Sequence, residues 1–153
     1  MKKRLIINLL CAGMVLSAFF TGCKASGEDY YQDGLSYYKN SDYSKAVECF
    51  QKAVENDSDN VSYSVYLGMS QLETGDYKGA MNTFGRVIIT EPLNRDAYRG
   101  LGIAYVNSGK YEDAIVALSK AVDLSKKNDN IKVDSMKYLA SCYYETGQYK
   151  EAV

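Results

Sequence analysis

The side chains in this sequence that could do chemistry are four cysteines, Cys11, Cys23, Cys49 and Cys142, and the 153-residue chain contains no histidine. Without histidine it lacks the commonest general base and the commonest neutral metal ligand. Cys49 and Cys142 lie far apart, and two residues do not define a disulfide framework, so we interpret them as small, partly buried thiols. Because a Gly-rich phosphate loop and a metal-ligand cluster are also missing, the sequence predicts no enzyme and no bound metal or cofactor.

Cys23 ends an apolar N-terminal stretch. Lys2, Lys3 and Arg4 are followed by an uncharged run over residues 5–23. A basic segment followed by an apolar one is typical of a secretory signal peptide, although the run is also long enough to form one spanning helix. Positive charge stays on the cytoplasmic side, so both interpretations place everything after Cys23 outside the cytoplasm.

The end of this run, Phe20-Thr21-Gly22-Cys23, resembles the processing box of bacterial lipoproteins, in which an apolar residue, a small residue and Gly or Ala precede Cys. The resemblance implies a signal peptide over 1–22, cleavage before Cys23 and a covalent diacylglycerol on the Cys23 thiol. Residues 23–27 would then be the lipidated cysteine and a short tether. The expected location is membrane-attached and extracytoplasmic, at the cell membrane or the outer membrane.

The body of the chain is mildly acidic. Apart from Lys2, Lys3 and Arg4, the chain carries 15 basic and 19 acidic side chains. Nucleic-acid binding needs clustered Lys and Arg to neutralise phosphates, and the only such pair is Lys126 and Lys127. The composition therefore predicts no nucleic-acid partner.

Residues 28–153 repeat with a period of about 34. Four segments align: SDYSKAV at 41, GDYKGAM at 75, GKYEDAI at 109 and GQYKEAV at 147. Gly34, Gly68 and Gly102 also recur in phase. Each glycine inside a helix costs about 1 kcal/mol relative to alanine, so the spacing indicates a close approach between two helices. After each motif, small and large apolar residues follow the period of a helix that is buried on one side.

The segment Tyr98, Leu101, Gly102 and Tyr105 matches the signature of the tetratricopeptide repeat, a helix-turn-helix unit, and the chain resembles this family over most of 27–153. The resemblance implies an all-α fold, a right-handed α-solenoid of antiparallel helix pairs with three full repeats and a truncated fourth. The expected units are 27–60, 61–94, 95–128 and an incomplete 133–153.

The fourth unit departs from the period. Four extra residues around 129–132 are most simply a longer connection between repeats. The sequence then stops three to five residues into the expected last helix, which would leave Leu139 and Tyr143 without a partner helix. We expect from this that further repeats or a capping helix follow in a longer protein.

In this family the first helix of each unit lines a concave groove that binds partners. By the phase of the repeat, the corresponding residues are Tyr31, Leu35, Tyr38, Val65, Met69, Leu72, Arg99, Ile103, Val106, Lys137, Ser141 and Tyr144. These side chains could equally be core residues packed between helices. At the positions where some family members hold a C-terminal carboxylate with Lys and Asn, this chain has Tyr31, Leu35, Tyr66, Asp96 and Gly100. We therefore expect an extended or helical apolar segment as the ligand.

The sequence thus predicts an interaction module that binds a protein or peptide. Four tether residues span roughly 14 Å when extended, so the partner should be membrane-proximal. Two alternatives stay open: an assembly factor for envelope, pilus or secreted-polymer machinery, and the N-terminal part of a larger protein.

Overall fold

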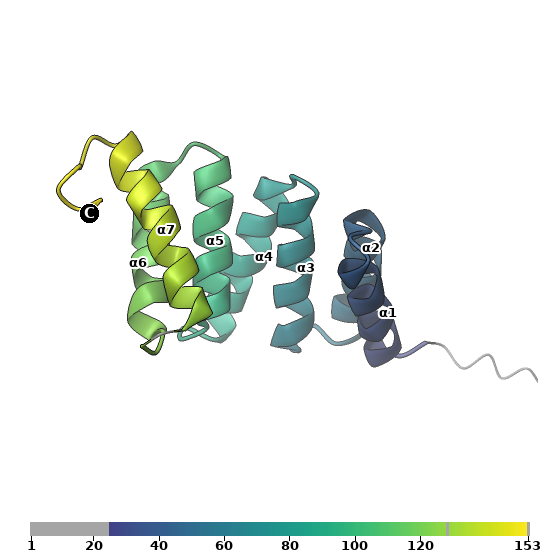
Figure 1. Cartoon of the computed structure of the whole chain (residues 1–153). Coiled ribbons are helices and arrows are strands. Elements are labelled where there is room, and N and C mark those ends of the chain that lie inside the picture. Colours follow the sequence, from purple (N-terminus) through teal and green to yellow (C-terminus); the bar gives the residue numbers. More distant parts are fainter. Residues whose placement is uncertain (1–24, 128, 153) are drawn as a thin grey trace, which may run out of the picture.

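The computed structural model describes residues 25–127 and 129–152, and the predicted signal peptide over 1–22 and Cys23 lie outside these ranges. Within them the chain forms α-helices and no strand: α1 Gly27–Lys39, α2 Tyr43–Asn56, α3 Val61–Glu73, α4 Tyr77–Thr90, α5 Arg95–Asn107, α6 Tyr111–Leu124 and α7 Asn130–Glu145. Consecutive helices run antiparallel and stack into an elongated array (Figure 1). We call α1, α3, α5 and α7 the A helices and the others the B helices. The predicted all-α solenoid of helix pairs is confirmed.

The core lies between the two layers of helices. The B helices bury the side chains that the sequence pattern indicated: Ala46, Phe50, Ala53, Ala80, Phe84, Val87, Ala114, Leu118 and Ala121. Their spacing of three and four residues puts them on one side of each helix. Burial of this apolar stripe, rather than helix propensity, stabilises helices of this length.

The glycines of the A helices allow the two layers to approach closely. A Cβ atom added to each would lie 2.6 Å from Phe50 at Gly34, 2.7 Å from Phe84 at Gly68 and 2.5 Å from Leu118 at Gly102. Side chains do not tolerate such distances in a close-packed interior. The close approach inferred from the repeat is therefore confirmed, and it explains why glycine stands in these helices despite its low helix propensity.

A further glycine, Gly100, was not explained by the sequence. A Cβ atom there would lie 2.3 Å from the Phe84 ring. The ring thus packs against Gly68 of its own helix pair and against Gly100 of the next A helix. This contact joins the second helix pair to the third.

The turns that follow the A helices share one backbone conformation. Gly75, Gly109 and Gly147 have φ of +80°, +69° and +74°. This left-handed region is easily reached by glycine and unfavourable for other residues. In the first turn the same place is taken by Ser41, with φ of +60°.

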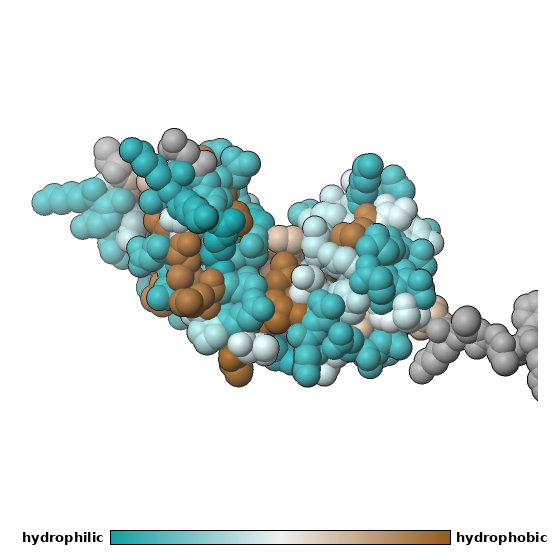
Figure 2. Space-filling view, turned by 90° about the horizontal axis from the view of Figure 1, so that it is seen from below, coloured by the Kyte–Doolittle hydropathy of each residue, from teal (hydrophilic) through white to brown (hydrophobic). Residues whose placement is uncertain are grey.

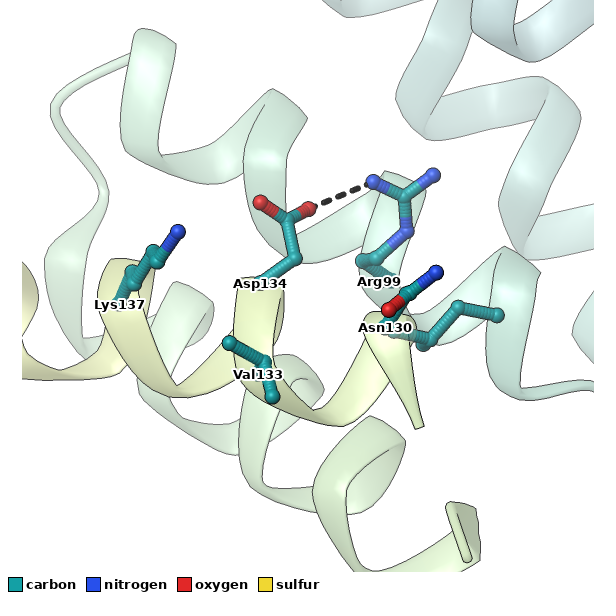
Figure 3. Close-up of a pocket in the computed structure, with 6 residues that line it drawn as sticks. Arg99, Asn130, Val133, Asp134 and Lys137 are labelled. Carbon is teal, nitrogen blue, oxygen red and sulfur yellow. Dashed lines mark hydrogen bonds and ion pairs between the residues drawn. The ribbon is translucent and has the colours of Figure 1, made fainter. Parts of the chain in front are cut away.

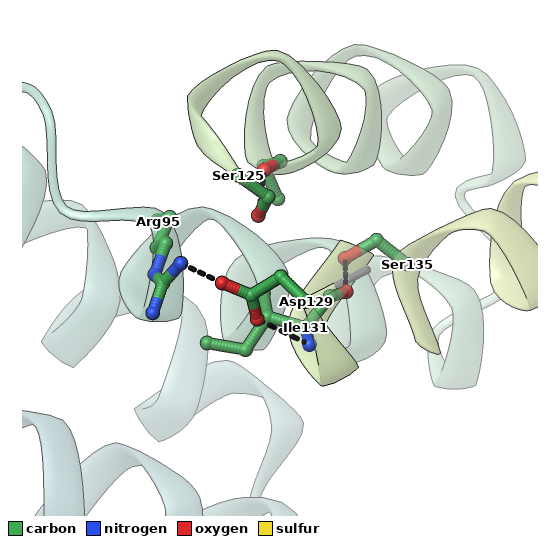
Figure 4. A network of polar contacts seen from close by, with 6 residues as sticks. Arg95, Ser125, Asp129, Ile131 and Ser135 are labelled. Atoms are coloured by element: carbon green, nitrogen blue, oxygen red, sulfur yellow. Dashed lines mark hydrogen bonds and ion pairs between the residues drawn. The ribbon is translucent and has the colours of Figure 1, made fainter. Parts of the chain in front are cut away.

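Of the four extra residues of the fourth unit, three lengthen a helix and one lengthens the connection before it. This connection has five residues, against four between α2 and α3 and between α4 and α5, so the predicted longer connection accounts for one residue only. Helix α7 begins at Asn130 and has 16 residues, whereas α1, α3 and α5 have 13. Its N-cap is Asp129, which accepts a hydrogen bond from the Ile131 backbone N–H at 2.9 Å and pairs with Arg95 of α5 (Figure 4). The cap and the ion pair together fix the start of α7 at this residue.

The expected last helix does not begin within the described residues. Residues 149–152 form turns after α7. Leu139, expected to lack a partner, is buried in a cluster with Cys142 and with Ala114 and Leu118 of α6. The preceding B helix therefore covers this side of α7.

Candidate partner-binding groove

The A helices form one face of the array, and this face is hollowed. Figure 2 shows hydrophobic side chains in the hollow between the two ends of the molecule. A groove of about 400 Å³ lies here between α1, α3, α5 and α7. We call it the central groove, and its lining residues are Tyr38, Met69, Leu72, Glu73, Tyr77, Arg99, Gly100, Ile103, Asn107 and Tyr138.

The central groove brings together five of the residues that the repeat phase placed on this face: Tyr38, Met69, Leu72, Arg99 and Ile103. Val65 lies in a neighbouring pocket of about 330 Å³, which it shares with Val61, Tyr66 and Met69. The apolar surface is therefore continuous along α3, and Met69 belongs to both cavities.

The other predicted residues are not in the central groove. Tyr31 and Leu35 pack against the cluster around Phe50, and Val106 packs against the cluster around Leu118. Tyr144 is 65% exposed, and its ring lies against that of Tyr149 at 5.6 Å.

Burial separates the side chains a partner can reach from those that support the fold. Ile103 is only 9% exposed and serves mainly as core beneath the groove. Met69 and Leu72 are partly exposed while packing on the cluster around Phe84. Met is flexible and polarizable, which suits contact with a variable surface. Met69 and Leu72 therefore form the accessible apolar wall.

Arg99 is the charged group at the centre of this face. Its Nη1 donates to Asp134 Oδ2 of α7 at 2.7 Å, and its side chain is 22% exposed (Figure 3). Its Nε is buried and has no hydrogen-bond partner among the described residues. A buried donor without a partner costs about 1–3 kcal/mol, so the structure keeps this guanidinium in place at a penalty.

Arg99 also lines a second cavity of about 410 Å³ between α5 and α7, which we call the Arg99 pocket. Its other lining residues are Asn130, Ile131, Val133, Asp134 and Lys137. The guanidinium thus lies where the central groove and the Arg99 pocket meet.

Charges of both signs act on the central groove. Burial raises the pKa of the Tyr38 hydroxyl above its usual range; the Glu73 carboxylate raises it further, while Arg99 opposes the increase. Tyr38 therefore stays protonated at neutral pH and can both donate and accept a hydrogen bond. The groove combines an apolar wall with a few polar groups, as ligand sites usually do.

Sequence reasoning missed several lining residues, notably Glu73, Asn107 and Tyr138. Tyr138 occupies the same position in its repeat as Gly100 and Tyr66. This position directly follows that of Arg99 and Lys137, so including it in the prediction would have found Tyr138. Glu73 and Asn107 end α3 and α5 and share a phase as well. Tyr77 belongs to the repeated motif, and only the structure shows it at the groove.

These features define a class of protein, a helical-repeat solenoid with a groove on its A-helix face. Two family models of the tetratricopeptide repeat match the chain, one over residues 28–60 and one over 67–129. Together they cover more than half of it, and the chain belongs to the tetratricopeptide-repeat family. The fold is that of a protein–protein interaction module. A search of the curated proteins finds no significant match.

Solved structures share the fold over most of the chain. MamA from Desulfovibrio magneticus RS-1, residues 41 to the end, is 29% identical with a TM-score of 0.75, and the match covers 84% of this chain and 71% of that one. The first TPR of Spaghetti (RPAP3), bound to the HSP90 peptide SRMEEVD, is 16% identical with a TM-score of 0.73 over 80% and 94%. The second TPR domain of human RPAP3, in complex with the HSP70 peptide SGPTIEEVD, is 19% identical with a TM-score of 0.69 over 76% and 93%.

No helix in the part of the chain that the structure describes is long and apolar enough to cross a membrane. The two RPAP3 domains share the fold of this chain.

Proposed function

We propose that this chain is a lipid-anchored interaction module on the extracytoplasmic face of a bacterial envelope, which binds an extended protein segment in the central groove. The observation that carries the groove assignment is the partly exposed apolar wall of Met69 and Leu72 facing the polar groups of Tyr38 and Arg99. Apolar contacts of this kind supply affinity, and the polar groups fix register and orientation.

The lipid anchor rests on the processing box that ends at Cys23 and on the short distance to the fold. Helix α1 begins at Gly27, so only residues 24–26 lie between the expected lipid and the first helix. A diacylglycerol adds about 0.8 kcal/mol for each buried CH₂, and two acyl chains anchor a protein firmly where one does not. The array would therefore lie close to the bilayer, and its partner should too.

Site-specific photo-crosslinking in the native host tests the groove. A photoreactive residue replaces Leu72 in the central groove or, as control, Val116 of α6, which is 73% exposed. We expect a discrete adduct from position 72 and none from position 116. Equal labelling from both positions would show that the groove is not the binding surface.

A charge introduced into the groove gives a second test. Leu72→Glu places a carboxylate on the apolar wall and should abolish capture of the crosslinked partner, whereas Val116→Glu should leave it intact. Ile103 is unsuitable, because a charge at this buried position would destabilise the fold. Circular dichroism establishes that both variants fold, and undiminished capture by folded Leu72→Glu would contradict the proposal.

The anchor is tested separately by the intact mass of protein extracted from membranes. Processing before Cys23 predicts loss of residues 1–22 and a gain of acyl mass. An unprocessed chain beginning at Met1 would rule out the anchor and leave the groove assignment unaffected.

A further inference from the structure

The side chains at one equivalent position of the four A helices differ in charge along the array. Residues in phase are Tyr31, Val65, Arg99 and Lys137, so the row is uncharged in the first two units and cationic in the last two. Arg99 and Lys137 both line the Arg99 pocket, and Arg99 also reaches the central groove. This face therefore carries two cationic side chains beside its apolar wall.

The guanidinium of Arg99 has N–H donors that make no hydrogen bond among the described residues. Arginine carries five N–H donors, and among the described residues only Nη1 has a partner, the Asp134 carboxylate. Asp134 comes from α7 on the same face, so a carboxylate can reach the guanidinium from this side (Figure 3). Because Nε is buried, a second carboxylate would bind through Nη2 and the remaining hydrogen of Nη1.

The cavities on either side of Arg99 indicate where along a ligand the carboxylate would lie. The central groove has the apolar wall of Met69 and Leu72, and the Arg99 pocket has Ile131 and Val133. A ligand that ended at Arg99 would leave one of the two cavities empty. A ligand with its acidic group in the middle would fill both.

We propose that the groove recognises an extended partner segment with an internal Asp or Glu, whose carboxylate pairs with Arg99 and Lys137 while apolar side chains on its two sides fill the central groove and the Arg99 pocket. This inference rests on the proposed function, because it names the ligand chemistry of the same groove. It places the anion inside the bound segment and not at a chain terminus.

Two acidic side chains near the site reduce the long-range attraction between this face and the partner's carboxylate. Glu73 lines the central groove and Asp134 the Arg99 pocket, so they offset the two positive charges at long range. Recognition then depends on direct hydrogen bonds to the guanidinium, which salt screens only weakly. Binding should therefore change little between low and moderate salt.

The test is a selection from random nine-residue segments displayed with linkers at both ends, against the full chain purified from membranes. We expect enrichment of Asp or Glu at an internal position with apolar residues on both sides. A selection against Arg99→Met should lose the acidic preference and keep the apolar one. Apolar segments with no acidic preference, or an acidic preference that persists against Arg99→Met, would overturn the proposal.

Fluorescence anisotropy with one selected segment, made as an N-acetylated and C-amidated peptide, measures the effect. Arg99→Met should weaken binding about 10- to 100-fold, as loss of a charged hydrogen-bonded pair does. Arg99→Lys should restore part of the affinity, and the exposed Lys120→Met on α6 should change nothing. Lys137→Met, at an exposed position, repeats the test without breaking the Asp134 pair.

Two outcomes separate this inference from the proposed function. If an added library with free C-termini yields binders that all need the terminal carboxylate, the internal-acid inference is wrong and the groove assignment holds. If no segment is selected from either library, and position 72 gives no adduct in the host, the proposed function fails as well.

Discussion

The two ends of the array join successive A helices with different chemistry. Between α1 and α3 the contact is aromatic: the ring of Tyr31 lies 4.8 Å from that of Tyr63 and 5.6 Å from that of Tyr66. The Tyr63 hydroxyl also donates to the Glu28 carboxylate at 3.0 Å. Between α5 and α7 the contacts are ionic, from Arg95 to Asp129 and from Arg99 to Asp134.

This difference shows that the repeat specifies how the helices are arranged. The type of side-chain contact between successive A helices can vary. The glycine spacing and the buried B-helix stripe are common to the full helix pairs. Aromatic contacts gain from burial, whereas these part-buried ion pairs must first offset the cost of removing their charges from water. We therefore expect the α1–α3 junction to be strong and the α5–α7 junction to be the weaker one.

The largest expected effect is at Phe50, the centre of the aromatic end. Phe50→Ala should lower the free energy of unfolding by about 3–5 kcal/mol, because it leaves a cavity and removes the aromatic contacts with Tyr31 and Tyr66. Urea unfolding followed by circular dichroism measures the loss. Leu118→Ala is the matched change at the other end and should cost less. A larger loss from Leu118→Ala would reverse the comparison.

The next effect is at Asp129, which caps α7 and pairs with Arg95. Asp129→Ala should destabilise α7 by about 1–2 kcal/mol, the sum of a lost N-cap and a partly exposed ion pair. Hydrogen exchange should show faster exchange in α7 and unchanged exchange in α1–α3. Asp123→Ala, at an exposed position on α6, is the control. Unchanged protection of α7 would mean that the pair does not hold this helix.

The sequence predicted the parts of the fold that recur in phase. Gly34, Gly68 and Gly102 signalled the close approach of helices, because three destabilising residues at one phase need a common reason. The start of α7 could not be predicted in this way. It depends on Arg95, which is distant in the sequence, and only the folded chain brings it to Asp129.

The groove was predictable in position and less so in detail. The phase put Leu72 and Ile103 on the same face, but it could not distinguish a partly exposed side chain from a buried one. That distinction is set by side chains from neighbouring helices, which a single period does not encode. The junction of two cavities at Arg99 likewise depends on α7, whose start the sequence misplaced.

A smaller effect is expected at the turns, where the first unit again differs from the later ones. Ser41 occupies the left-handed conformation that Gly75 and Gly109 adopt elsewhere. Ser41→Gly should stabilise the chain by about 0.5–1 kcal/mol, and Gly109→Ala should destabilise it by about 1 kcal/mol. Urea midpoints measure both changes. Destabilisation by Ser41→Gly would mean that the serine makes a contact worth more than the strain.

The reactivity of Cys49 and Cys142 can be used to compare the two ends of the array without a substitution at either end. Burial raises the pKa of the Cys49 thiol in α2 and of the Cys142 thiol in α7. A raised pKa means less thiolate at a given pH, so both should react with iodoacetamide more slowly than free cysteine at pH 8 and faster as the pH rises. Peptide mass spectrometry assigns the rate to each site.

The two thiols should nevertheless respond differently to loss of the ionic junction. Cys142 is fully buried, so its alkylation requires α7 to open, whereas Cys49 is already partly exposed. Asp129→Ala should therefore accelerate labelling of Cys142 by about tenfold, as expected for a destabilisation near 1.4 kcal/mol, and leave Cys49 unchanged. Equal acceleration at both sites would mean that the array opens as one unit and that its two ends do not differ in stability.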